Sequence, residues 1–178
     1  GEVTLYTDTL VYDRNKSLGY YKCGGKLVDS LNTLTSKHGY YYSNTKLAEF
    51  RYDVVGFNNN STIKSDTLTY NTETKISTIL GPTHIFHSDS TIIYSELGWY
   101  NSDTDKSKLL KKSLINHGNG KSLAGDTIFY DKRIGIGEAF HNVALADTIK
   151  KINAILISEK CRCDRIEELY LNNEEEYM

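Results

Sequence analysis

The chain has few of the residues that mark several common protein classes. Its 178 residues include one proline, one methionine, one tryptophan and three cysteines. Three cysteines cannot form the disulfide framework that stabilises many small secreted domains, so Cys23, Cys161 and Cys163 leave the redox compartment open. No apolar run approaches the roughly 18–20 residues that cross a bilayer as a helix.

An excess of charge of one sign is also lacking. The net charge of −2 provides no broad basic face for gripping nucleic acid phosphates. The composition is 39% hydrophobic and 25% charged, which allows a buried core and is unlike a disordered chain. No signal peptide is visible and Gly1 opens directly into strand-like sequence. We therefore expect a processed or excised segment of a longer protein.

What the sequence does contain is tyrosine and repetition. Tyrosine occurs 14 times against five phenylalanines, which together with many Thr, Ser and Asn residues favours β structure. The stretch SDTLTYNTETK at 65–75 has relatives at 7–16, 36–46, 95–106 and 125–135. The last aromatic residue of each expected strand is an anchor: Tyr12, Tyr41, Tyr70, Tyr100 and Tyr130. The separations of 29, 29, 30 and 30 residues predict stacked supersecondary units.

Other positions recur with the anchors. An aliphatic residue stands seven positions before each one: Leu5, Leu34, Ile63, Ile93 and Leu123. Four positions before the anchor the residue is acidic in four of five units: Asp8, Asp66, Glu96 and Asp126, with Lys37 as the exception. A unit of this length would span roughly 100 Å if extended, so we expect it to fold back as two main strands, about ten overall.

The aliphatic position and the apolar strand end are separated by an odd number of residues. A flat strand would place them on opposite faces. Either both faces are partly covered, or the pair Ser65-Asp66 and its equivalents form a bulge that switches faces. We favour the bulge, and a ladder that continues unbroken through Ser65 and Asp66 would contradict it.

The segments TIKSDTLTYNTETKISTILGPTHI and LAGDTIFYDKRIGIGEAFHNVAL carry a family resemblance. With the register of the five units, they resemble the OstA-like/LptA family of lipopolysaccharide transport proteins. YSELGWYN and GIGEAFHNV look like the longer OstA-like proteins of Bacteroidetes-type bacteria. The resemblance covers residues 1–147. It implies an all-β open jelly roll, or β-taco, of stacked antiparallel strands with an apolar interior.

The resemblance also implies a function. Members of this family sit in the periplasm of Gram-negative bacteria, shield lipid A acyl chains and join related transport-bridge proteins by edge-strand pairing. They are not enzymes, use no cofactor and do not span the membrane. Keeping a lipid chain in water costs about 0.8 kcal/mol per CH₂ group, so a carrier needs a continuous apolar trough. The candidate lipid-binding interior consists of Leu5, Leu34, Ile63, Leu68, Tyr70, Ile93, Trp99, Tyr100, Leu123, Ile128 and Tyr130.

Structural interpretations compete with each chemical one. The aliphatic and anchor positions are core residues first, whether or not they also contact a ligand. The recurring acids could form a metal ladder, but Lys37 breaks the row, so we expect them to bind backbone amides of bulges or turns. The pair Cys161 and Cys163 is a weak candidate for redox or metal chemistry. We expect no catalytic residue, no metal and no cofactor.

The repeat pattern ends near Thr148. The next anchor would fall at Glu159 or Lys160, and residues 148–178 form a non-repeat segment for which we expect a helix or a disordered tail. A truncation, an altered reading frame and a genuine cap would each explain it. A helical cap would cover the last strand edge and block end-to-end assembly there.

Two rival functions are open at this point. A structural or adhesive repeat protein would have a closed, fully packed core instead of a trough. A β-helix carbohydrate-active enzyme would need its acids gathered in one cleft, which acids spaced one per repeat do not favour. The state of the interior separates the first rival from a lipid carrier.

Overall fold

The computed structural model describes residues 3–30, 32–118, 120–147 and 154–164. These residues form sixteen strands, all joined in one antiparallel sheet, and no helix. The strands are β1 (Thr4–Thr7), β2 (Val11–Asp13), β3 (Leu18–Tyr21), β4 (Gly25–Val28), β5 (Thr33–Ser36), β6 (His38–Tyr42), β7 (Leu47–Phe57), β8 (Ser61–Asn71), β9 (Ile76–Ile79), β10 (Thr83–His87), β11 (Ile92–Ser95), β12 (Leu97–Asn101), β13 (Lys106–His117), β14 (Lys121–Asp131), β15 (Ile136–Asp147) and β16 (Ala154–Asp164).

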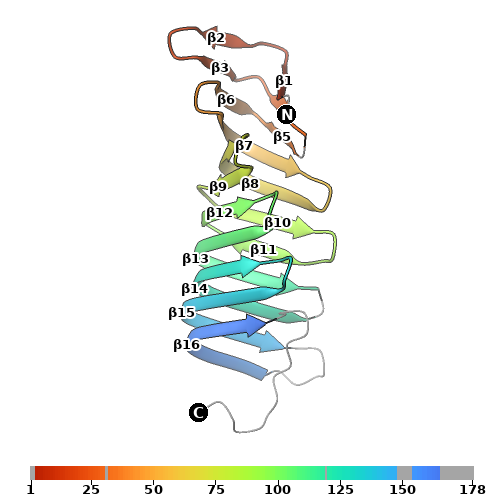
Figure 1. Cartoon of the computed structure of the whole chain (residues 1–178), viewed down its shortest axis with the longest axis vertical. Coiled ribbons are helices and arrows are strands. Elements are labelled where there is room, and N and C mark those ends of the chain that lie inside the picture. The colour runs from red at the N-terminus through yellow and green to blue at the C-terminus, as the bar shows by residue number, and fades with distance from the viewer. Residues whose placement is uncertain (1–2, 31, 119, 148–153, 165–178) are drawn as a thin grey trace.

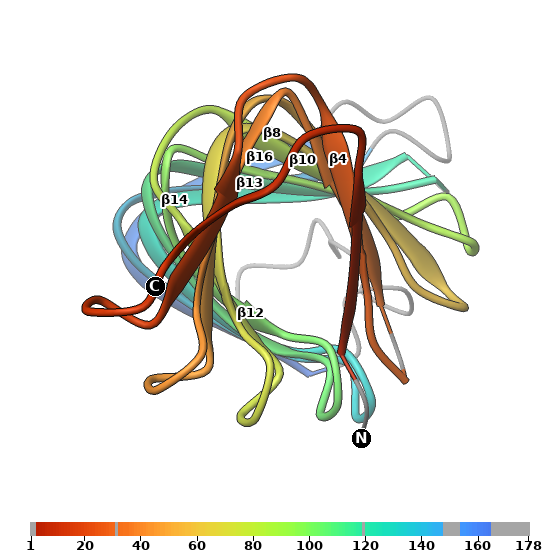
Figure 2. The ribbon, with the colours of Figure 1, turned by 90° about the horizontal axis from the view of Figure 1, so that it is seen from above.

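The sheet is folded along its length into two walls that meet at a corner. One half of the long strand β8 pairs with β10 in the first wall, and the other half pairs with β9 in the second wall. Seen along the long axis, the stacked strands form an arch whose turns lie at its free margins (Figure 2). The strands follow one another along that axis from β1 to β16 (Figure 1). The predicted all-β antiparallel fold is therefore confirmed, while the number of repeats stays a prediction.

More strands form than the ten expected, because the corner divides several of them. The chain leaves the ladder between β9 and β10, at residues 80–82, beside the point where β8 turns the corner. The same division separates β11 from β12 at Glu96. Each expected strand is thus either one long bent strand, such as β8 or β14, or two short ones.

The bulge lies on a different strand from the one we predicted. Strand β8 has no extra residue at Ser65 and Asp66, so that pair does not carry the bulge. The register shift lies in the neighbouring β7, where Tyr52 and Asp53 have φ of 64° and 52°. Equivalent pairs with positive φ are Lys111-Lys112 in β13 and His141-Asn142 in β15. The extra residues belong to the neighbouring strand, which must travel farther around the corner.

The switch of faces itself is present. Ile63 and Ser65 are buried, Asp66 is exposed, and Leu68 and Tyr70 are buried again. The buried side of the strand therefore changes between Ser65 and Leu68, which is where the strand passes from one wall to the other. Both apolar sets then face the inside of the arch, as the odd spacing in the sequence required.

The C-terminal segment corrects another expectation. Residues 154–164 form strand β16, which pairs with β15 from Ile136↔Asp164 to Asp147↔Ala154, so a helix over these residues is wrong. The unpaired edge of β15 offers a full row of backbone hydrogen bonds, and this tertiary pairing overrides weak helical spacing. Residues 148–153 and 165–178 lie outside the described residues, as do the side chains of Cys161 and Cys163. The boundary at 147/148 stays a prediction.

Candidate functional site

The inside of the arch is an apolar core that runs along the stack. Nine of the predicted interior residues belong to one buried cluster: Leu34, Ile63, Leu68, Tyr70, Ile93, Tyr100, Leu123, Ile128 and Tyr130. Leu5 is partly buried and packs against that cluster. The structure therefore brings these ten side chains to one interior, and their contact with lipid stays a prediction.

Trp99 is the exception. It stands in β12 between the buried Gly98 and Tyr100, so the alternation of the strand places it on the outer face. Its cross-strand neighbours there are Thr78 and Lys108. The prediction that Trp99 lines the interior is wrong, because a residue next to a buried anchor must point the other way. Phe129 has the same position beside Tyr130 and lies under the Lys108 ammonium, 5.0 Å from the ring centroid.

The candidate set also omitted interior residues. Many of them follow their anchor by nine positions: Tyr21, Phe50, Ile79, Leu109 and Ala139 are all buried. The same repeat alignment that selected the aliphatic residues before the anchors contained this second signal. Leu27, Ile85 and Ile115 complete the first wall and pair across strands with other core residues, such as Leu27↔Leu34 and Ile85↔Ile93.

Polar contacts join the two walls at the margins away from the corner, along a line that we call the seam. Asp29, in the turn between β4 and β5, has a side chain that is 1% exposed. From the opposite wall, Tyr70 donates its hydroxyl proton to Asp29 Oδ2 over 2.6 Å, and Lys75 Nζ lies 2.9 Å from the same oxygen. Asn32 Nδ2 donates to the Tyr70 hydroxyl over 2.8 Å and to Ser102 Oγ over 3.2 Å.

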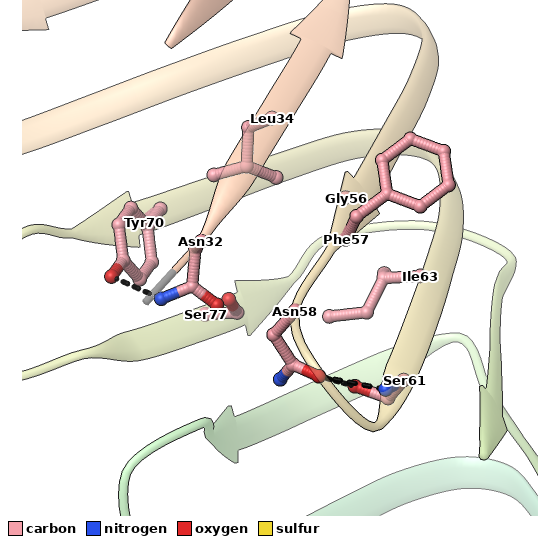
Figure 3. A pocket seen from close by; sticks show the side chains of 9 residues that line it. All are labelled: Asn32, Leu34, Gly56, Phe57, Asn58, Ser61, Ile63, Tyr70 and Ser77. Atoms are coloured by element: carbon pink, nitrogen blue, oxygen red, sulfur yellow. Dashed lines mark hydrogen bonds between the residues drawn. The ribbon is translucent and has the colours of Figure 1, made fainter. Parts of the chain in front are cut away.

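Burial and the neighbouring Asp29 carboxylate raise the pKa of Tyr70 well above its ordinary range, so its phenol stays protonated as a donor. Figure 3 shows the Tyr70 hydroxyl and the Asn32 amide pointing toward one another. We call Asp29, Asn32, Tyr70 and Lys75 the Asp29 cluster. Its members come from turns and strand ends of both walls, so it holds the margins together.

A second contact crosses the seam farther along the stack. Lys132, in the turn between β14 and β15, forms an ion pair with Asp89, in the turn between β10 and β11. Burial opposes ionisation of Asp89, but hydrogen bonds from Lys132 and Thr91 outweigh it and hold the pKa of that carboxyl well below its usual range. The neighbouring His87 packs edge-on against Tyr100, with ring centroids 6.1 Å apart.

The walls leave little empty space between these contacts. A pocket lined by Asn32, Leu34, Gly56, Phe57, Asn58, Ser61, Ile63, Tyr70 and Ser77 has room for about one water molecule (Figure 3). Ile63 is 7% exposed, the most of any residue in the buried cluster. As it stands, this part of the interior is filled by the protein's own side chains.

The N-terminal end is more open than the middle. Tyr6, Val11 and Tyr12 of the first strands, and Leu10 between these strands, are each more than two-fifths exposed. The anchor Tyr12 is thus accessible, whereas Tyr70 and Tyr100 are buried. The stack therefore presents accessible apolar surface at its N-terminal end.

The described part of the chain lacks two other kinds of feature. No group of three or more His, Cys, Asp or Glu side chains there could hold a metal ion. The described residues also contain no helix that is long and apolar enough to cross a membrane. Asp66, Glu96 and Asp126 contact side chains near the corners, as Asp126 does when it accepts a hydrogen bond from Asn142 over 2.7 Å.

Known proteins share both sequence and fold with this chain. The model of the family described as OstA-like protein matches residues 1–66. Over these residues the chain is similar to OstA-like proteins. LptH of Pseudomonas aeruginosa, described as the LptA-homologous periplasmic component of a lipopolysaccharide transport device, has a similar structure with a TM-score of 0.57. The identity is 16%, over 71% of this chain and 93% of LptH, so this likeness concerns the fold.

The two likenesses cover different parts of the chain. The family match supports the OstA/LptA-like resemblance that the repeats indicated, and the LptH likeness extends the jelly-roll architecture over most of the chain. The family match thus agrees with the predicted resemblance over residues 1–66. No curated protein matches the chain in sequence.

Proposed function

We propose that this OstA-like chain is a bridge module for lipopolysaccharide transport, whose interior shields lipid A acyl chains. The observation that carries this proposal is the apolar cluster that continues through the stack, from Leu27 near one end to Leu145 near the other. An acyl chain needs continuous apolar surface along its length, since each exposed CH₂ costs about 0.8 kcal/mol. The match to the OstA-like family supports the same proposal.

The proposal includes a location and a mode of assembly. The similar LptH is a periplasmic component, so we place this chain in the periplasm of a Gram-negative bacterium. Strand β1 pairs with β4 and β2 pairs with β3, which leaves their other edges free within the sheet. Such edges accept a strand from a related bridge protein by backbone pairing. The chain needs no catalytic group for this role.

The packed interior favours a second candidate. A structural or adhesive repeat protein would keep its core closed, and the buried cluster and the small pocket fit that state. The two candidates differ in one property. A carrier has an interior that opens to lipid, and a scaffold has one that does not.

Site-specific photo-crosslinking tests the proposal. A photoreactive residue at Ile63 or Leu68 lies inside the arch, and one at Trp99 lies on the outer face of the same stack. In cells, we expect lipopolysaccharide adducts at the two interior positions and none at Trp99. Adducts at no interior position would favour the closed scaffold. Equal adducts inside and outside would show nonspecific lipid contact and contradict the proposal.

A further inference from the structure

The seam contacts join turns that belong to different walls and different repeats. Asp29 and Lys75 are 46 residues apart, and Asp89 and Lys132 are 43 apart. In each case an aspartate from the first wall meets a lysine from the second. The acid comes from a turn that connects two strands of one wall, and the lysine from a turn beyond an anchor tyrosine.

The position between these two contacts lacks the charge pair. There the turn between β7 and β8 presents Asn58, whose side-chain oxygen accepts hydrogen bonds from the amides of Asn60 and Ser61 in its own turn. The equivalent of Lys75 in the next turn is Asp105, which accepts a hydrogen bond from Tyr100 over 2.7 Å. Charge pairs therefore close the described seam at two separated places.

The seam must part if a ligand is to enter the arch from the side. The pocket beside the Asp29 cluster holds about one water molecule, so an acyl chain can enter only if the walls separate. At the corner the walls are continuous backbone, as in β8, and cannot separate. Among the residues that the structure describes, side-chain contacts alone join them at the seam.

We propose that the Asp29 cluster and the Asp89–Lys132 pair are a clasp that holds the walls together in the empty protein and opens when acyl chains enter. This inference rests on the proposed function and adds the residues that regulate access. The clasp suits a reversible closure, because the buried Asp29–Lys75 pair and the partly exposed Asp89–Lys132 pair each contribute little net stability. Opening returns the buried Asp29 carboxylate to water.

A reversible lock tests the clasp. Asn32→Cys and Ser102→Cys place two thiols across the seam, where the native side chains lie 3.2 Å apart. Cys23, Cys161 and Cys163 are first changed to Ser so that a short, reducible bifunctional thiol reagent joins only the new pair. We expect the cross-linked protein to lose capture of lipopolysaccharide and to regain it after reduction. The same double variant without reagent is the control.

A second variant weakens the clasp without creating a cavity in the core. Asp29→Asn keeps the shape of the side chain and removes its charge, while Asp103→Asn makes the same change in an exposed turn. We expect Asp29→Asn to raise the apparent affinity for lipopolysaccharide about tenfold. The reason is that the closed state loses about 1.4 kcal/mol of stability relative to the open state. Asp103→Asn should leave affinity unchanged.

The outcomes separate the clasp from the proposed function. If the uncross-linked protein captures no lipopolysaccharide, the proposed function is wrong. If it does, and the locked protein captures as much, the clasp is wrong while the function stands. The lock does not depend on Asp29, so it decides the matter even if Asp29→Asn does not fold.

Discussion

Lys37 and Asp53 form an ion pair at a corner of the arch, with 2.5 Å between Nζ and Oδ2. Farther along the stack, Glu96 takes the place of Lys37 and Lys112 takes the place of Asp53, at 2.8 Å. The backbone agrees, since the amides of Lys37 and Glu96 donate to the carbonyls of Tyr52 and Lys111. The lysine that broke the acidic row in the sequence is therefore matched by a reversed charge on the neighbouring strand.

This relationship predicts the outcome of a charge exchange. Lys37→Glu alone puts two carboxylates at one corner and should lower the melting temperature slightly, because both side chains are exposed. Adding Asp53→Lys should restore it. The measurement is thermal unfolding at low and high salt, where high salt should shrink the effect of the single change. A single and a double variant that melt alike would refute the pairing.

His87 predicts a pH dependence of stability. Burial, followed by the nearby Lys132 ammonium, lowers its pKa to about 4, against the opposing charges of Asp89 and Asp105. As the pH falls through about 6.5, the unfolded chain takes up the proton before the folded protein does. The free energy of unfolding should therefore decline between about pH 6.5 and 4, by up to about 3 kcal/mol.

Urea unfolding across this pH range measures the effect. His87→Phe is the matched variant, because it keeps an aromatic ring against Tyr100 and removes the titrating group. We expect its stability to change less over the same range. The same pH slope in both proteins would mean that other groups cause the decline.

Substitutions at interior and exterior positions should differ in their effect on the stability of the protein. Leu68 is fully buried, so Leu68→Ala should lower the free energy of unfolding by about 2–5 kcal/mol through lost burial and a cavity. Trp99→Ala removes a larger side chain from the outer face and should cost less. Denaturant unfolding of the two variants gives the comparison. A greater loss for Trp99→Ala would contradict the placement of that residue outside the core.

Gly98 should not tolerate a side chain. Its φ is +147°, and a Cβ there would lie 2.2 Å from the carbonyl oxygen of Lys108, which belongs to the paired strand. Gly24 is the control, since its φ of +91° is equally unusual but nothing lies within 4 Å of its Cβ position. Gly24→Ala should cost about 1–2 kcal/mol from backbone strain alone.

Gly98→Ala should cost more than Gly24→Ala, because the β12–β13 pairing must also shift to remove the overlap. Thermal unfolding of both variants measures the difference. Equal losses would show that strain alone matters at both sites, and would place the Lys108 carbonyl farther away than the structure has it.

The sequence by itself determined the β architecture and most of the interior. The anchor spacing of 29 or 30 residues and the aliphatic residue seven positions earlier, such as Ile63 before Tyr70, reflect a local rule of alternate burial. That rule acts within one strand, so it can be read from neighbouring residues. Applied to Trp99, which is next to the buried anchor Tyr100, the same rule places the side chain on the outer face.

The tertiary structure decided the rest. Which strand carries the corner bulge depends on path length around the bend, and β16 depends on the free edge of β15, so neither is visible in local sequence. The contact between Asp29 and Lys75 depends on how the stacked strands bring turns from two walls together across 46 residues. Local pattern fixes which face of a strand is buried, but only the assembled walls determine which distant side chains meet.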